Sequence, residues 1–334
     1  MKNAAAGRTR SASALWYVDK GKVELRAEPL PEPTREEVLV RTLFSGVSRG
    51  TERLILSGAV PLSEGERMRA PFQRGAFPFP VKYGYCAAGV VEAGPKELRG
   101  RTVFVLHPHQ DFFVAPASLV AVVPAAIPPK RATLAANMET ALNALWDANC
   151  GPGDRIVVVG GGVIGLLTAF LAAKMPGTEV TLVDVMPERD PIARQLGVGF
   201  AVPSQAPRDA DVVFHTSATA EGLSTAIGAA GLEGTIVEMS WYGEGCIPVP
   251  LGCAFHSRRL RLISSQVTEV APTHRPRWTR RRRLEAALSL LQDPCLDALI
   301  TDEIDFTEAP ARLPKVLAAN APGLAPVIRY SAAV

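Results

Sequence analysis

The stretch that decides the fold is IVVVGGGVIGLLTAFLAA, residues 156–173. A run of β-branched residues comes first, three glycines interrupt it, and good helix formers follow. This order predicts a strand, a tight turn and a helix. The stretch is also apolar and long enough to raise the question of a membrane span. Because glycines break it near its start, the strand, turn and helix are favoured, and we expect no membrane span.

The glycines in this stretch have the G-x-G-x-x-G spacing of a dinucleotide-binding turn. The first allows the turn, the second lets the backbone approach a pyrophosphate, and the third lets helix and strand pack closely. A second strand, VTLVDV, contains Asp184, 19 residues past the last glycine, where the fingerprint places an acid that accepts hydrogen bonds from the ribose. The residues predicted to bind the cofactor here are Gly160, Gly162, Val163, Ile164, Gly165 and Asp184.

The acid also bears on which nicotinamide cofactor is bound. The Asp184 carboxylate would repel a 2′-phosphate, and Val185, Met186 and Pro187 follow it instead of an arginine. The sequence therefore favours NAD, with NADP less favoured. The alternative is a Rossmann-like domain that binds no dinucleotide.

Strand and helix patterns alternate around this motif. From residue 132 to about residue 267 the alternation requires a parallel sheet with right-handed crossovers. Before it, short alternating runs such as EEVLVRTLF and DFFVAPASLVAVVP, separated by Gly and Pro, predict a small barrel-like β domain. The first 13 residues are small, basic and polar, and we expect them to be an unstructured lead-in.

Composition narrows the class of partner. The 334 residues include 36 basic and 33 acidic side chains, a net charge of +3, so no strong overall field favours nucleic acid as a partner. The five cysteines include no CxxC pair and match no disulfide framework. A reducing cytoplasm is the expected setting.

Four further stretches resemble one family. GYCAAGVVEAGP resembles a G-H-E-x-x-G-x-V-x-x-x-G segment, GRTVFVLHP a G-D-R-V strand, METALNALW a T-A-x-x-A-L helix, and LDALITDEIDFTEAPARLPKVL an L-x-x-L-I-T segment. In this order, with the fingerprint near the middle, the chain is similar to the medium-chain dehydrogenase/reductase superfamily over nearly its whole length.

The resemblance implies an α/β fold with a GroES-like β-barrel substrate domain and a Rossmann doubly wound parallel sheet. The implied boundaries are 1–133 for the substrate domain, 134–272 for the NAD-binding domain, and 273–334 for a return to the substrate domain. It also implies an active site in the cleft between the domains, a homodimer, and a cofactor contact from Thr140 in METALNALW.

The chain departs from the zinc-binding members of that family. Ser48 stands where they have a cysteine, and Tyr85 and Cys86 stand where they have a His-Glu pair. The third ligand position falls near Ala136 or Asn137. Serine, tyrosine and asparagine are poor ligands for zinc. We therefore expect no catalytic zinc.

Among zinc-free members, SGVSRGTERLILSG, FHTSA and SWYG look most like the bacteriochlorophyllide dehydrogenase subgroup. Those enzymes oxidise a 1-hydroxyethyl side chain of a tetrapyrrole to an acetyl group. The substrate class implied by this resemblance is a flat, acidic heterocycle.

The loop around residue 48 supplies the candidate catalytic residues. Ser48 or Thr51 would hydrogen-bond the substrate oxygen, or would only cap a helix. Tyr85 would donate to a carbonyl, or would only fill the vacated metal volume. Arg49 would reach the cofactor pyrophosphate, or would be a surface arginine. Glu52 would pair with Arg49 or another base, or would be a helix-terminal acid favoured by the dipole.

Other candidates lie further along the chain. His215 and Ser217 end a strand of the parallel sheet, where backbone contacts to the cofactor are expected, and Trp241 and Tyr242 end the next strand. His107 and His109 are expected in a loop near the substrate mouth rather than in a metal site.

The arginines at 280–283 form the one strong charge run. They are interpreted as a solvated helix start, with attraction for an acidic substrate as the alternative.

The leading hypothesis is a zinc-independent oxidoreductase that moves a hydride between a nicotinamide and an alcohol or carbonyl carbon of a small-molecule substrate. Two alternatives stay open. One is a reductase of carbon–carbon double bonds, of the enoyl or quinone type. The other is a non-catalytic nucleotide-binding sensor or partner-binding protein.

Overall fold

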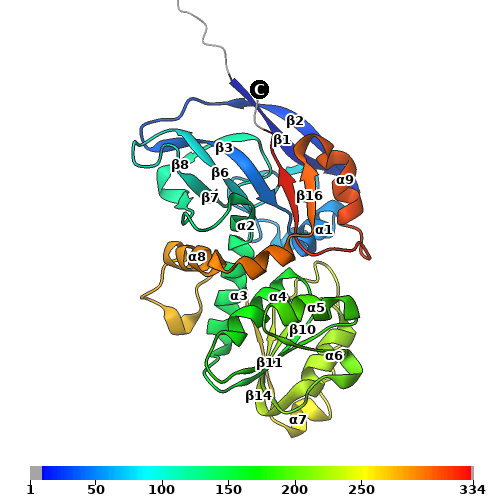
Figure 1. The fold of residues 1–334 in the computed structure, drawn as a ribbon. Helices are drawn as coiled ribbons and strands as arrows, with labels where there is room; N and C mark the ends of the chain where they lie inside the picture. The colour runs from blue at the N-terminus through cyan, green and yellow to red at the C-terminus, as the bar shows by residue number, and fades with distance from the viewer. Residues whose placement is uncertain (1–9, 332–334) are drawn as a thin grey trace, which may run out of the picture. The chain divides into compact units, whose positions relative to one another are not determined.

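The structure, a computed structural model, describes residues 10–331. Within them, the positions up to Thr133 and from Thr301 onward form one compact unit, here called the terminal unit. Leu134–Ile300 form the other, the central unit. The sheets of the terminal unit are antiparallel except for one parallel pair, and the sheet of the central unit is parallel (Figure 1). The predicted fold class, α/β with a β domain and a doubly wound parallel sheet, is confirmed.

The terminal unit contains two sheets. One has the strand order β2-β1-β5-β4, and the other β16-β17-β3-β6-β7-β9, with β8 also paired to β3. The strands are β1 (Arg10–Asp19), β2 (Lys22–Leu30), β3 (Glu37–Gly46), β4 (Arg74–Gly75), β5 (Val81–Lys82), β6 (Ala87–Ala93), β7 (Thr102–Val105), β8 (Phe112–Pro116), β9 (Ala121–Val122), β16 (Asp302–Asp305) and β17 (Pro326–Arg329). Its helices are α1 (Arg49–Ser57), α2 (Pro129–Ala132) and α9 (Ala309–Val316).

The last part of the chain adds two strands, β17 and β16, to the second sheet. β17 pairs antiparallel with β3, which places Val327 opposite Gly46, and parallel with β16. The inner face is lined by alternate apolar residues, as expected for half-buried strands: Val38, Val40, Val103, Val105, Phe113 and Ala115.

The expected lead-in at residues 1–13 is wrong for residues 10–13. These residues begin β1 and pair with the end of β2, with Arg10 opposite Leu30. Ala12 packs against Leu30 and Leu39, so small side chains here serve close sheet packing. Residues 1–9 lie outside the described part of the chain.

The central unit is built on a six-stranded sheet of order β12-β11-β10-β13-β14-β15, in which every neighbouring pair is parallel. The strands are β10 (Arg155–Val159), β11 (Glu179–Val183), β12 (Gly199–Ala201), β13 (Ala210–His215), β14 (Ala230–Glu238) and β15 (Arg261–Ser264). The helices are α3 (Ala135–Ala148), α4 (Val163–Ala173), α5 (Asp190–Gln195), α6 (Ala220–Ala229), α7 (Ala254–Ser257) and α8 (Arg280–Ser289).

The strand order places a topological switch beside the first strand. β11 and β12 lie on one side of β10, and β13, β14 and β15, which follow in the chain, lie on its other side. Ligands of doubly wound sheets bind outside the carboxyl ends of the strands at this point. The predicted strand, turn and helix at residues 156–173 are confirmed as β10, a glycine turn and α4.

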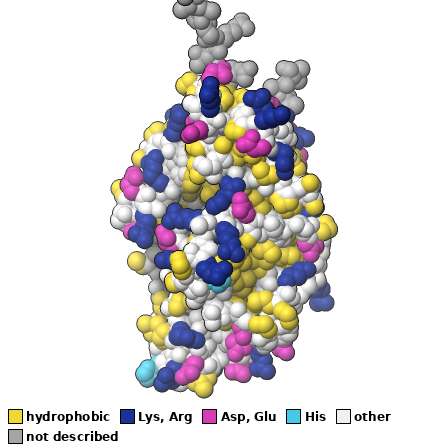
Figure 2. All heavy atoms as spheres, turned by 90° about the vertical axis from the view of Figure 1, so that its left-hand side faces the viewer, with side chains coloured by type: hydrophobic (Ala, Val, Ile, Leu, Met, Phe, Trp, Pro, Cys, Tyr) yellow, Lys and Arg dark blue, Asp and Glu magenta, His cyan; other side chains and the backbone are white. Residues whose placement is uncertain are grey.

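Two surface properties bear on partners. None of the helices within residues 10–331 is long and apolar enough to cross a membrane. On the face drawn in Figure 2, basic and acidic side chains both occur among neutral and hydrophobic ones.

Candidate functional site

The glycine turn after β10 contains two glycines that packing demands. Gly160 has a φ of 113°, and a Cβ there would lie 2.7 Å from the backbone nitrogen of Ser217. A Cβ on Gly165 would overlap the carbonyl oxygen of Gly160. Helix α4 can therefore lie this close to the strand only because both positions lack a side chain.

Gly162 is different. It is the N-cap of α4, with a φ of −75° that any residue adopts. Apart from its chain neighbours, no heavy atom of the described residues lies within 4 Å of the place a Cβ would take. Nothing in the described chain requires a glycine here, so the open space at the helix N-terminus is the feature that fits a phosphate ligand. Val163 and Ile164 begin α4 and are half-buried beside this space.

Asp184 follows β11 and lies beside the turn. Its carboxylate accepts hydrogen bonds from the backbone N–H of Gly161 at 2.5 Å and of Met186 at 2.8 Å. Each carboxylate oxygen keeps further acceptor capacity, so ribose hydroxyls can still donate to it. The side chain of Arg189 also reaches the turn, with its Cγ 3.1 Å from where a Cβ on Gly161 would be.

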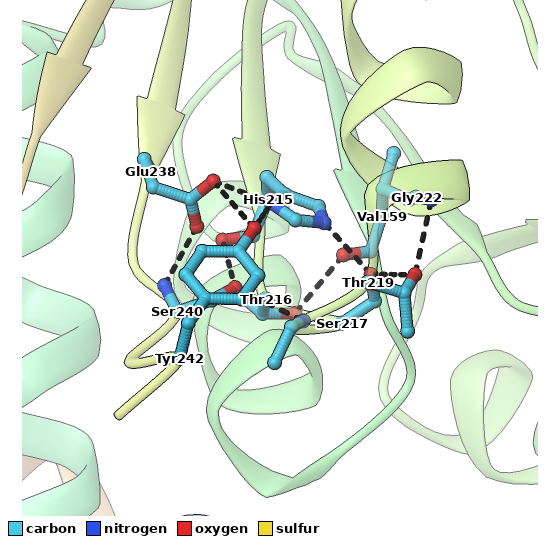
Figure 3. Close-up of polar contacts among 10 residues, drawn as sticks. Val159, His215, Thr216, Ser217, Thr219, Gly222, Glu238, Ser240 and Tyr242 are labelled. Carbon is cyan, nitrogen blue, oxygen red and sulfur yellow. Dashed lines mark hydrogen bonds and ion pairs between the residues drawn. The ribbon is translucent and has the colours of Figure 1, made fainter. Parts of the chain in front are cut away.

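A polar network occupies the carboxyl ends of β13 and β14 (Figure 3). His215 is fully buried, and its two ring nitrogens contact Glu238 Oε2 and Ser217 Oγ, each at 2.7 Å. The Ser217 hydroxyl lies 3.0 Å from Thr219 Oγ1, which caps α6 by accepting from the N–H of Gly222.

Glu238 is held in its ionised form. Burial acts to raise the pKa of this carboxyl, but the hydrogen bond and charge of His215 and the N–H of Ser240 outweigh it and leave the pKa below its ordinary value. Tyr242 donates to Glu238 Oε2 at 3.1 Å, and burial raises the pKa of its phenol. The β14 strand ends at Glu238, so Trp241 and Tyr242 lie beyond it in the following loop.

Hydrogen bonds also join the loops after three neighbouring strands. Thr216 Oγ1 donates to the carbonyl oxygen of Gly160 at 2.9 Å, and the N–H of Ala218 donates to Ser240 Oγ at 3.1 Å. The glycine turn and the His215 network therefore belong to one edge of the sheet. Thr140 lies in α3, where its hydroxyl donates to the carbonyl of Ala136 in its own helix.

In the terminal unit the structure brings the three candidate catalytic hydroxyls together. Tyr85 donates to Ser48 Oγ at 2.6 Å, and Thr51 Oγ1 lies 3.4 Å from the Tyr85 hydroxyl. The Ser48 side chain makes no capping hydrogen bond to α1. Burial raises the pKa of Tyr85, so the phenol stays protonated and remains a donor.

The rings of Tyr83 and Tyr85 meet edge-on, with centroids 5.9 Å apart. Residues 83–86 lie between β5 and β6, and Gly84 has a φ of 123°, which breaks the alternation of a strand.

Glu52 and His109 form a buried pair that sequence reasoning missed. Both are fully buried, with Glu52 Oε2 lying 3.0 Å from His109 Nε2 and 2.5 Å from the Tyr17 hydroxyl. The other carboxylate oxygen accepts from the N–H of Ser48 at 2.7 Å. Of the two partners expected for Glu52, Arg49 or another base, the structure has another base, His109, with the Tyr17 hydroxyl as a further donor. His109 lies in the loop between β7 and β8 as expected, but no part of it is exposed, so its expected place at a substrate mouth is wrong.

His107 is likewise buried rather than at a mouth. Its ring stacks on Phe113 with centroids 3.8 Å apart, and burial lowers its pKa to about 3. Among the described residues no group of three or more His, Cys, Asp or Glu side chains could hold a metal ion.

The Arg49 guanidinium donates to three carbonyl oxygens ahead of β17, those of Ala321 at 2.5 Å, Pro322 at 3.1 Å and Gly323 at 2.6 Å. Its role toward a pyrophosphate stays a prediction.

The expected solvated charge run is wrong for Arg283. This residue is 2% exposed, pairs with Glu139 at 2.9 Å and donates to Asn143 Oδ1 at 2.5 Å. Helical spacing turns one arginine of the run inward, while Arg280 and Arg281 pair with acids at the surface.

The sequence around Glu238 contains a pattern that predicts a site residue. The residue is an acid at the end of the apolar strand run GTIVEM, next to a strand that ends in a histidine. The partners of Glu52, by contrast, lie at positions 17 and 109, with no local pattern to connect them.

Comparisons with known proteins agree with this geometry. The family described as pyridine nucleotide-disulphide oxidoreductase matches residues 130–221. The chain is 28% identical over 184 residues to D-guloside 3-dehydrogenase of Escherichia coli (strain K12), which covers 51% of this chain and 53% of that protein. It is 27% identical over 216 residues to an uncharacterized zinc-type alcohol dehydrogenase-like protein of Haemophilus influenzae, which covers 60% and 59%. The chain thus matches little more than half the length of these curated relatives.

Solved structures share the fold over nearly the whole chain. L-idonate 5-dehydrogenase from Escherichia coli superposes with a TM-score of 0.78 at 15% identity, covering 96% of this chain and 98% of that one. A candidate zinc-binding dehydrogenase from Sinorhizobium meliloti 1021, bound to NADP, gives 0.75 at 20% identity, with 96% and 99% covered. A short chain alcohol dehydrogenase from Escherichia coli CFT073, complexed with NADH, gives 0.75 at 16% identity, with 96% and 99% covered. These likenesses show that the chain shares the fold of these dehydrogenases.

Proposed function

We propose that this chain is a nicotinamide-dependent oxidoreductase of the medium-chain type, which moves a hydride between the cofactor and an alcohol or carbonyl carbon. One observation carries the proposal. Packing demands glycine at Gly160 and Gly165, whereas Gly162 faces open space at the N-terminus of α4. That space, with Asp184 beside it, fits the pyrophosphate and ribose of a dinucleotide. The names of the relatives, several of them dehydrogenases, support the same reaction class.

NAD is the proposed cofactor, ahead of NADP. The Asp184 side chain can accept from both ribose hydroxyls, and its negative charge would repel a 2′-phosphate placed near the turn. The structural neighbours include one bound to NADP and one complexed with NADH, so the preference rests on Asp184 alone. When bound, the nicotinamide supplies the hydride acceptor or donor.

The hydroxyl cluster of the terminal unit is the proposed group that acts on the substrate oxygen. Tyr85 stays protonated and now donates to Ser48, so its proton is available to an oxygen that takes the place of the Ser48 hydroxyl. Thr51 lies near enough to hold the phenol in position. Hydrogen bonds of this kind stabilise charge on oxygen without a Lewis acid.

We also propose that the reaction is zinc-independent, although two curated relatives are named as zinc-type proteins. Ser48 and Tyr85 hydrogen-bond each other, and neither is a good zinc ligand. Metal analysis of the purified protein tests this point. One equivalent of zinc that is needed for activity would refute it.

Two substrate classes compete. The resemblance of SGVSRGTERLILSG, FHTSA and SWYG to the bacteriochlorophyllide dehydrogenase subgroup favours the hydroxyethyl side chain of a tetrapyrrole. The names D-guloside 3-dehydrogenase and D-xylulose reductase favour a sugar or polyol as the second candidate. The resemblance to the medium-chain superfamily supports the proposal of a homodimer. A reducing cytoplasm is proposed on the cysteines, all five of which are free thiols.

The deciding experiment has two stages. NADH and NADPH are titrated into the protein and followed by nucleotide fluorescence, and a response to neither would refute the cofactor proposal. Hydride transfer from deuterated cofactor is then followed with tetrapyrrole, polyol and enone substrates. Label on a former carbonyl carbon supports the proposal, whereas label on a former double bond supports an enoyl-type reductase. Binding without turnover of any substrate, unchanged in Ser48→Ala and Tyr85→Phe, would favour a sensor.

A further inference from the structure

The central unit contains an open groove that lies apart from the glycine turn. Its volume is about 600 Å³, and it lies where α3 and α4 end and where the chain turns after α8. α4 begins at the glycine turn and only its last residues line the groove, so two to three turns of helix separate the two places. The apolar residues that line the groove are Leu142, Leu145, Trp146, Phe170, Leu171, Met175 and Leu290.

The polar groups that line the groove carry no net charge. Lys174 pairs with Asp293 at 3.1 Å, and the Lys174 ammonium also lies over the ring of Phe170. Burial raises the pKa of Cys150 to about 12, so its thiol stays neutral. Burial also lowers the pKa of His274, which keeps its imidazole neutral at neutral pH. The groove therefore suits an uncharged, apolar part of a ligand.

The aromatic rings at one end of the groove are already stacked. His274 lies on Trp146 with ring centroids 4.1 Å apart and an interplanar angle of 11°. Trp278 meets Trp146 at 4.7 Å, and Arg282 covers the Trp278 ring, with Cζ 3.9 Å from the centroid. These contacts occupy ring faces on which a planar group such as a nucleic-acid base would stack. The lining that remains is mostly aliphatic and favours an alkyl chain.

A group of arginines, here called the arginine cluster, lies at this aromatic end. It consists of five exposed or half-exposed residues that follow His274: Arg275, Arg277, Arg280, Arg281 and Arg282. Two acids at the surface, Glu269 and Glu285, each pair with one of them at 2.6 Å. The cluster exceeds these acids by three positive charges, which equals the net charge of the whole chain, +3. Surface ion pairs contribute little, so an incoming carboxylate or phosphate can replace the acids on the guanidinium groups.

We propose that the groove and the arginine cluster together bind an anionic amphiphile with a single alkyl chain, such as a fatty acid or an alkyl phosphate. The chain lies in the groove, and the carboxylate or phosphate lies on the arginine cluster. The two parts of the site match the two parts of this ligand, because the groove is apolar without net charge and the cluster at its end has an excess of positive charge. The site is separate from the glycine turn, so this proposal does not depend on the proposed function.

The test is a calorimetric titration of the full chain with decyl phosphate, dodecyl phosphate and decanol, each below the concentration at which it forms micelles. Each CH₂ group removed from water strengthens binding about fourfold, so dodecyl phosphate should bind about tenfold to 20-fold more tightly than decyl phosphate. Decanol has the same chain as decyl phosphate but no charge, and it should bind more weakly than decyl phosphate by about fivefold or more.

Two variants separate the groove from the arginine cluster. Leu290→Glu places a charge in the groove at a side chain that is 37% exposed, and it should weaken binding of decyl phosphate and decanol alike by about tenfold or more. The double variant Arg277→Ser, Arg280→Ser should weaken binding of decyl phosphate about fivefold to tenfold and leave decanol binding unchanged. Leu251→Glu and Arg259→Ser are the matched controls, since both side chains are exposed on the central unit and neither lines the groove.

The outcomes are distinct. Circular dichroism establishes that each variant is folded, and the double arginine variant decides if Leu290→Glu does not fold. Absence of saturable binding of either alkyl phosphate to the wild-type protein would overturn the site, as would equal weakening in the control variants. Binding to phosphatidylserine vesicles without binding of the free alkyl phosphates would overturn the single-chain ligand and favour a membrane surface. Failure of the wild-type protein to bind NADH would overturn the proposed function and leave this site standing.

Discussion

Replacement of Gly162 by alanine separates what the turn does for the fold from what it does for a ligand. The residue has φ and ψ of −75° and 178°, and no described atom beyond its chain neighbours lies within 4 Å of the new methyl group. The free energy of unfolding should therefore change by no more than about 0.5 kcal/mol. Gly165→Ala is the contrasting variant, because its methyl would overlap the carbonyl oxygen of Gly160.

The affinity of Gly162→Ala for dinucleotide should fall clearly, although its stability changes little. The Gly162 methyl would stand where a pyrophosphate approaches the N–H groups of the first turn of α4. Loss of one hydrogen bond to a charged phosphate oxygen costs about 1.5–3 kcal/mol. The dissociation constant for NADH should therefore rise about tenfold to 150-fold, with a melting temperature close to wild type.

The assay pairs NADH fluorescence titration with thermal unfolding of the same samples. In Gly165→Ala the free energy of unfolding should fall by about 1–3 kcal/mol, because overpacking forces the backbone to shift. Wild-type affinity in Gly162→Ala would refute the phosphate site at this turn. A large loss of stability in Gly162→Ala would contradict the observation that the space beside Gly162 is open.

Three further predictions concern single residues. Arg283→Met should destabilise the protein by about 3–5 kcal/mol in urea denaturation, since it leaves Glu139 buried and unpaired. Burial already raises the pKa of Glu139, so this deficit should shrink as pH falls and be smallest below about 4.3, where the carboxyl becomes neutral in the unfolded state as well; a pH-independent deficit would contradict it. Asp184→Asn should raise affinity for NADPH relative to NADH by about fivefold or more in parallel titrations, because one like charge is removed; an unchanged ratio argues against contact with the ribose. Tyr85→Phe should lower kcat/KM about a hundredfold while NADH affinity stays the same; equal loss of both would point to a structural role.

The parts of the fold that the sequence predicts are those encoded within about 30 neighbouring residues. The β-branched run predicts β10, the glycines predict the turn, and the run of helix formers predicts α4, without information from distant parts of the chain. Asp184 is found by its distance from the turn. The expectation for residues 10–13 failed because pairing with β2, rather than local composition, makes them a strand.

The site residues that sequence reasoning misplaced depend on distant partners. Glu52 has the sequence context of a helix-terminal acid, yet it is buried because Tyr17 and His109 satisfy its carboxylate. Arg283 belongs to a solvated-looking run, yet Glu139 lies 144 positions away and pairs with it in the core. Burial of a charge is decided by the partner available in three dimensions, and no spacing rule in one segment reveals it.

The carboxyl edge of the central sheet should respond to substitution as one site. Thr216 bonds the carbonyl of Gly160, and the backbone of Ser217 lies against that same glycine, so the turn and the His215 network share atoms in contact. Free energies add only for sites without shared partners. If both bind one nucleotide, Gly162→Ala and Ser217→Ala combined should weaken NADH binding by less than the product of their separate effects, because a ligand displaced from the turn has already left the serine. Strict additivity in the same titration would mean that the two places act on the ligand independently and not as one site.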